Sequence, residues 1–166
     1  MKKSAINTAI LIIFVLCVSV FVYKRYNVPP AIDLPEISLT DLNGHKVSLN
    51  AYAGRPLFLS FFATWCGPCM RELPELADLR MKLSDEHLQL VCISDEPIER
   101  LLALQAHFGG QLIILHSAKN FHDIGIYTYP TNYIFNAKGN KVYEKVNPDD
   151  WENPDMIRNI KQLIEK

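Results

Sequence analysis

The sequence predicts an α/β fold, a central mixed sheet with helices on both faces, and three observations support this class. Short apolar runs at 57–62, 88–94 and 112–115 are typical of strands that are buried on both faces. Segments with apolar residues at helical spacing separate these runs, so strands and helices alternate along the chain. Asn43-Gly44 and Ala137–Asn140 each join two short strand-like stretches, which predicts two hairpins.

The helices are expected at three main places. The first follows the central strand and reaches about Glu86, with a bend at Pro74. The second begins at Pro97 and is ended by Gly109-Gly110. Asn153-Pro154 caps the last one, which carries apolar residues at helical spacing. The expected order is a hairpin followed by β-α-β-α-β-α-β-β-α, in which the third helix is a short one at 120–124.

An apolar run at 5–23 precedes this domain, with Lys2-Lys3 before it and Lys24-Arg25 after it. Nineteen helical residues reach about 28 Å, close to the thickness of a bilayer's hydrocarbon core, so we expect a retained transmembrane signal anchor. A cleaved signal peptide is the alternative, but the end of the run lacks an A-x-A-like site. The expected organisation is a tail at 1–4, the anchor at 5–23, a proline-containing linker at 24–35 and a folded domain at 36–166.

The charge of the chain argues against one class of partner. Of 17 basic residues, four flank the apolar run, which leaves 13 against 18 acidic residues for the rest of the chain. A net charge of about −5 does not attract a polyanion, so we expect no nucleic-acid partner.

The motif Cys66-Gly67-Pro68-Cys69 lies where the central strand is expected to end and a helix to begin. Unpaired N–H groups at a helix start stabilise a thiolate, which lowers the pKa of Cys66 and makes this residue the expected nucleophile. Cys69 lies three residues further on, a spacing that brings both sulfurs to one helix face. We therefore expect a redox-active disulfide in which Cys66 attacks a substrate disulfide and Cys69 resolves the mixed disulfide.

Other uses of a C-x-x-C motif fit this chain less well. A zinc site needs further ligands, and Cys17 and Cys92 are single and far apart in the sequence. Haem attachment needs a histidine after the second cysteine, where this chain has Met70. Peroxidases and copper chaperones use a different cysteine spacing. Cys17 and Cys92 lie in apolar segments, where a cysteine is usually a small hydrophobic residue.

The string Trp65–Cys69 resembles the active site of thioredoxins, and Pro74 falls where thioredoxins carry a helix-kinking proline. The longer string Phe61–Cys69, followed by Glu72-Leu73-Pro74, is similar to the membrane-anchored TlpA/ResA-like branch of that superfamily. The resemblance covers about 36–166. It implies a thioredoxin-like fold with an N-terminal β-hairpin and an αβ insertion, with Trp65, Gly67 and Pro68 as residues that support the active site.

The resemblance also implies a second part of the site. In thioredoxin-like proteins a cis-proline faces the cysteine pair, and here that residue is Pro130. The backbone of Tyr129 would then bind an extended substrate segment. Thioredoxins carry a buried aspartate six residues before the first cysteine, whereas this chain has Ser60, so another group must accept the proton of Cys69. Glu96 is a candidate proton acceptor. We expect no cofactor and no bound metal.

The Gly67-Pro68 pair resembles that of reducing thioredoxins, so we expect a protein-disulfide reductase. The resemblance implies a membrane thiol-electron donor, a disulfide-containing protein as substrate, and an apocytochrome c awaiting haem as one such substrate. It also places the chain in the bacterial inner membrane as a single-pass protein, held in the lipid bilayer by 5–23, with the domain on the periplasmic side. The alternatives are a disulfide oxidase, a copper-binding or metallochaperone-like assembly module, and a redox-silent interaction module.

Overall fold

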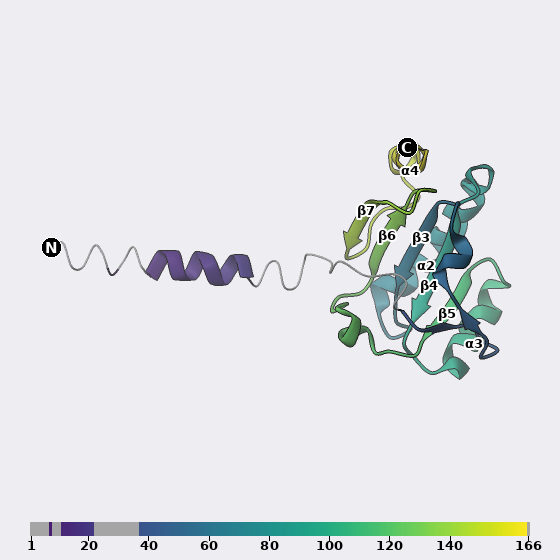
Figure 1. The fold of residues 1–166 in the computed structure, drawn as a ribbon, viewed down its shortest axis with the longest axis horizontal. Helices are drawn as coiled ribbons and strands as arrows, with labels where there is room; N and C mark the ends of the chain where they lie inside the picture. The colour runs from purple at the N-terminus through teal and green to yellow at the C-terminus, as the bar shows by residue number, and fades with distance from the viewer. Residues whose placement is uncertain (1–6, 8–10, 22–36, 166) are drawn as a thin grey trace.

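The computed structural model describes residues 7, 11–21 and 37–165, and its main feature is a mixed sheet of seven strands in the order β2-β1-β5-β4-β3-β6-β7 (Figure 1). The strands are β1 (Leu39–Thr40), β2 (Lys46–Val47), β3 (Leu57–Phe61), β4 (Gln89–Ser94), β5 (Ile113–Ser117), β6 (Thr131–Phe135) and β7 (Lys141–Val146). β3, β4 and β5 run parallel to one another, while β1, β2, β6 and β7 pair antiparallel with their neighbours. The predicted mixed sheet and its strand sequence are confirmed.

β3 is central to the sheet, and all five of its residues are buried. It pairs with β4 on one side and β6 on the other, so Ser60 lies between Cys92 and Asn132. Ser60, one residue before the end of β3, and Asn132 are buried polar residues in the middle of the sheet. Among the described residues, the hydroxyl of Ser60 has no hydrogen-bond partner.

The helices cover the two faces of the sheet unequally. The α-helices are α2 (Gly67–Lys82), α3 (Ile98–Phe108) and α4 (Pro154–Ile164), and the 3-10 helices are η2 (Leu49–Tyr52), η3 (Ser84–Glu86) and η4 (Phe121–Ile124). The three α-helices pack in one core with Phe58, whereas η2 and η4 pack on the opposite face with Leu59 and Phe61. Successive right-handed crossovers in one direction, from β3 to β4 to β5, place α2 and α3 on the same face. Helices thus cover both faces, but α-helices cover only one.

Two element boundaries differ from the expected ones. α2 ends at Lys82, before Glu86, and the chain continues into η3 and then His87 in the left-handed conformation, with φ 55°. Serine and aspartate in η3 favour such local turns over a continuing helix. The first hairpin turns through the loop Asp41–His45 rather than through Asn43-Gly44 alone. Within this loop the side chain of Asp41 accepts hydrogen bonds from the backbone N–H groups of Asn43 and His45.

Only part of the expected membrane anchor belongs to the described residues. Residues 11–21 are helical, and no helix among the described residues combines the length and the apolar character needed to cross a membrane. Most of the remaining positions of the 5–23 segment, and the whole 24–35 linker, lie outside the described residues.

Candidate functional site

Cys66 and Cys69 form a disulfide at the start of α2. Cys66 is the N-cap residue, and its Sγ accepts a hydrogen bond from the backbone N–H of Cys69 at 3.2 Å. Gly67 is the first helical residue and Pro68 lies in the first turn, where a missing N–H breaks no helical hydrogen bond. The sulfur of Cys66 is thus held at the positive end of the helix dipole, which stabilises a thiolate after reduction.

Burial distinguishes the two cysteines. The exposed fraction of Cys66 is 6%, and that of Cys69 is 1%. Cys66 is therefore the more accessible of the two sulfurs. This is compatible with the predicted roles of Cys66 as nucleophile and Cys69 as resolving residue, which stay predictions.

Two aromatic residues from distant parts of the chain meet beside this disulfide. Trp65 is 68% exposed, and its ring lies edge-on against that of Tyr129, with the ring centroids 5.5 Å apart. Tyr129 also contacts Phe121, and the peptide bond between Tyr129 and Pro130 is cis, as the resemblance implied. Burial raises the pKa of Tyr129 to about 12, so its hydroxyl remains protonated at neutral pH. The expected substrate-binding pair therefore lies next to the residue that precedes Cys66.

The Pro130 loop is tied to the sheet and to the chain that follows β7. The carbonyl oxygen of Pro130 accepts a hydrogen bond from the backbone N–H of Asn147 at 2.9 Å. The hydroxyl of Thr131 donates to the carbonyl oxygen of Thr128 at 2.7 Å. Both hydrogen bonds are accepted by backbone carbonyl groups, at Pro130 and at Thr128, and they hold this part of the chain in place.

Glu96, the candidate proton acceptor, is hydrogen-bonded to the chain just before the cysteine motif. It is 7% exposed and accepts hydrogen bonds from the backbone N–H and, at 2.8 Å, the hydroxyl of Thr64. Arg100 pairs with the same carboxylate at 2.9 Å. Thr64 lies two residues before Cys66, so Glu96 holds the loop that leads into the motif. The hydroxyl of Ser94 also donates to this carboxylate, at 3.5 Å, so Glu96 ties the loop before the motif to the end of β4, and its role as a proton acceptor stays a prediction.

Glu72 is a buried carboxyl next to the motif to which the sequence analysis assigned no role. It lies on α2 three residues after Cys69, on the same buried helix face, and it is only 2% exposed. Its Oε1 accepts hydrogen bonds from the indole N–H of Trp151 and, at 3.1 Å, from the side-chain N–H of Asn132. Burial raises the pKa of the Glu72 carboxyl to about 7, although these hydrogen bonds act to lower it.

The sequence held one signal for Glu72. The buried stripe of α2 includes Cys69, Leu73 and Leu76, and an acidic residue at position 72 lies within that stripe. A carboxyl on the apolar face of a helix needs partners or a raised pKa, which marks it as a candidate acid or base.

Cys92 behaves as the sequence predicted. It is a free cysteine on β4 with no exposed surface, and burial raises the pKa of its thiol far above the ordinary value. It packs as a small side chain in the core, as expected.

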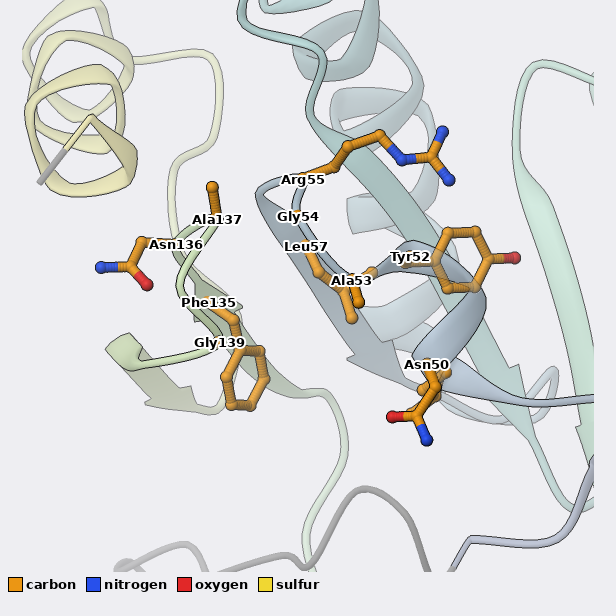
Figure 2. Close-up of a pocket in the computed structure, with 11 residues that line it drawn as sticks. Asn50, Tyr52, Ala53, Gly54, Arg55, Leu57, Phe135, Asn136, Ala137 and Gly139 are labelled. Carbon is orange, nitrogen blue, oxygen red and sulfur yellow. The ribbon is translucent and has the colours of Figure 1, made fainter.

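A pocket of about 230 Å³ opens away from the cysteine pair. Figure 2 shows Tyr52 and Arg55 among the lining residues on one side of it, and Phe135 and Asn136 on the other. Leu57 begins β3, whereas Cys66 follows the end of that strand, so the pocket belongs to the opposite end of the sheet. It is not part of the disulfide site.

The fold and the disulfide at the start of α2 define a thiol-disulfide oxidoreductase of the thioredoxin-like class. Residues 31–143 match the model of the AhpC/TSA family, and the chain belongs to this family.

Relatives and solved structures agree with this class. The chain is 31% identical over 121 residues to the thioredoxin-like protein YneN of Bacillus subtilis, which covers 70% of this chain and 71% of the relative. It is 23% identical over 154 residues to the thiol-disulfide oxidoreductase ResA of Bacillus thuringiensis, covering 87% of this chain and 89% of the relative. A thiol:disulfide interchange protein from Chlorobium tepidum has a similar fold, with a TM-score of 0.63, 24% identity, and coverage of 81% of this chain and 99% of the other.

Proposed function

We propose that the protein reduces disulfides in extracytoplasmic proteins and that its anchor segment holds it in a membrane. The observation that carries the proposal is the Cys66–Cys69 disulfide at the start of α2, next to Trp65 and the cis-Pro130 loop. This arrangement combines a stabilised thiolate, a resolving thiol and a backbone segment that can bind an extended chain.

The reaction begins with the reduced pair. The Cys66 thiolate attacks one sulfur of the substrate disulfide, forms a mixed disulfide with it, and releases the other sulfur as a thiolate. Cys69 then loses its proton and attacks the sulfur of Cys66, which releases the second substrate thiolate. Two electrons pass to the substrate, and the Cys66–Cys69 disulfide forms. A dithiol donor must then reduce this disulfide.

Glu72 is the group that we propose accepts the proton of Cys69. An ordinary thiol has a pKa near 8.5. The pKa of the Glu72 carboxyl, about 7, is near enough to that value for the carboxylate to accept the thiol proton at neutral pH. An ordinary glutamate, with a pKa near 4.3, would be a much weaker base. Burial of Glu72 beside the cysteine pair therefore serves the second step.

Three features support the reducing direction and the location. The Gly67-Pro68 pair resembles that of reducing thioredoxins, whose potential is about −270 mV. The apolar run at 5–23 has the length of a membrane-spanning helix, and several relatives are named thiol-disulfide oxidoreductase ResA. A bacterial inner-membrane protein with its domain outside would receive electrons from a membrane thiol donor. Apocytochrome c is the substrate that we propose, in cytochrome c maturation.

The proposal is tested with the full chain in detergent micelles. The assay follows the reduction of a protein disulfide with a dithiol as the source of electrons. We expect turnover with the disulfide, none in Cys66→Ser, and accumulation of a mixed disulfide in Cys69→Ser. Equal turnover in Cys66→Ser and the unaltered protein would exclude the mechanism. Stoichiometric Cu(I) binding without turnover would favour the assembly-module alternative.

A further inference from the structure

Two side-chain donors converge on one oxygen of Glu72. The indole N–H of Trp151 and the amide N–H of Asn132 both donate to Oε1 of Glu72. Neither Trp151 nor Asn132 has any exposed surface, so both hydrogen bonds lie out of contact with bulk water. Hydrogen bonds from buried donors to a carboxylate favour its ionised form over its protonated form.

Both donors are connected to the loop that carries Pro130. Asn132 is the second residue of β6, which begins directly after Pro130. Trp151 lies in the loop between β7 and α4, and this loop begins with Asn147, whose backbone N–H donates to the carbonyl oxygen of Pro130. The donors therefore join the proposed substrate-binding loop to the carboxyl beside the resolving cysteine.

Packing leaves the indole of Trp151 little freedom to turn. Its ring lies edge-on to Phe58, with the centroids 5.0 Å apart, and edge-on to Tyr143 at 6.0 Å. The backbone N–H of Trp151 also donates to Oε2 of Glu75 on α2, at 3.4 Å. The position of the indole N–H is therefore fixed by the core as well as by the hydrogen bond to Glu72.

The other groups that act on Glu72 come from several elements. On α2, the charge of Glu75 acts to raise the pKa of Glu72, whereas a backbone hydrogen bond from Asp149 acts to lower it. Cys92 on β4 and Tyr143 on β7 also feel the charge of Glu72, and both remain neutral because burial raises the pKa of each. None of the groups named here brings a positive charge to Glu72, so neutral donors must stabilise its carboxylate.

We propose that Trp151 and Asn132 are positioning residues that hold the Glu72 side chain by Oε1 and keep it as a carboxylate able to accept the proton of Cys69. This inference rests on the proposed function, because only an exchanging cysteine pair needs that proton to be accepted. It assigns a task to the loop between β7 and α4, which the cysteine motif alone does not reveal.

The test uses the full chain in micelles in its oxidised form, in which Cys66 and Cys69 do not titrate. The ¹³C signal of the Glu72 carboxyl, assigned by its loss in Glu72→Gln, is followed against pH. Trp151→Phe and Asn132→Leu each replace one donor by an apolar side chain that cannot hydrogen-bond to Glu72. Tyr143→Phe is the matched control, because it removes a hydroxyl that donates to Asp149 at 2.6 Å and leaves both side-chain donors to Glu72 in place.

We expect the Glu72 midpoint to rise by about one pH unit in each donor variant and to stay unchanged in Tyr143→Phe. The acidic limb of turnover by the reduced protein should move upward by the same amount. An unchanged midpoint in folded Trp151→Phe and Asn132→Leu would overturn the inference. That outcome is distinct from failure of the proposed function, in which Glu72→Gln would turn over with the rate and pH profile of the unaltered protein.

Discussion

Glu72 makes a direct prediction about stability against pH. Burial raises its pKa from an ordinary 4.5 to about 7. Between these two pH values the folded protein keeps a proton on Glu72, whereas the unfolded chain has released it. The stabilisation from protonated Glu72 is complete below pH 4.5 and is lost as the pH rises through 7. Over this window the free energy of unfolding should fall by about 3 kcal/mol on account of Glu72 alone.

The variant that isolates this contribution is Glu72→Gln. Glutamine keeps an oxygen that can accept from Trp151 and Asn132, and it carries no proton to lose. Unfolding by guanidinium chloride is measured from pH 4.5 to 8 in the oxidised protein, and the two free energies are subtracted at each pH. The difference should favour Glu72→Gln increasingly with pH, by about 3 kcal/mol at the upper end.

The control for this experiment is Glu99→Gln, which alters an exposed carboxyl on α3. Its difference from the unaltered protein should stay nearly constant over the same pH range. A flat difference for Glu72→Gln, or one that favours the unaltered protein at pH 8, would refute the reasoning. Although Glu72→Gln should be more stable at high pH, it should be less active, because loss of the proton acceptor should slow turnover by about 100-fold or more.

Three further predictions concern the surroundings of the cysteine pair. Glu96→Gln loses part of the hydrogen bonding to Thr64 and should lower the free energy of unfolding by about 1 to 3 kcal/mol. Arg100→Gln removes the exposed partner of the buried Glu96 carboxylate and should cost less, because the hydrogen bonds from Thr64 remain; equal costs of the two variants in chemical denaturation would contradict this. Tyr129→Ala removes the ring that packs on Trp65 and should raise KM for a protein disulfide about two- to tenfold while leaving reduction of a small disulfide unchanged; an equal loss with both substrates would argue against a binding role. Trp65→Phe leaves Trp151 as the sole tryptophan, and its fluorescence should change with a midpoint near pH 7; emission independent of pH would speak against the hydrogen bond to Glu72.

The cysteine site was predictable because its determinants are local. The apolar run, Cys66 and Pro68 lie within a dozen residues, so strand, turn, helix start and sulfur spacing all follow from adjacent residues. The cis bond before Pro130 is different: it followed from family resemblance, because the local sequence does not distinguish cis from trans.

The hydrogen-bond partners of Glu72 could not be predicted from the sequence, although its place in the apolar stripe of α2 marked it as a candidate acid or base. Its hydrogen-bond partners, Asn132 and Trp151, lie 60 and 79 residues away, and no sequence pattern shows that they converge on one oxygen. The contacts of Glu96 were likewise not visible in the sequence. Its position at a strand end suggested a proton acceptor, but its contacts with Thr64 depend on how a loop 32 residues earlier folds back.

The distribution of helices also depended on three-dimensional order. The sequence pattern predicted that helices alternate with strands, but it did not state which strand pairs with which. Because β3, β4 and β5 are neighbours in that order, α2 and α3 share one face of the sheet. Short 3-10 helices then cover the other face.

The central claim is that the Cys66–Cys69 pair delivers electrons to substrate disulfides. The measurement that tests it most directly is the reduction potential of this pair, obtained by equilibrating the full chain in micelles with dithiol buffers at pH 7. We predict a value near about −270 mV, as in reducing thioredoxins. A value near about −120 mV, typical of strong disulfide oxidants, would contradict the account and assign the protein to disulfide formation.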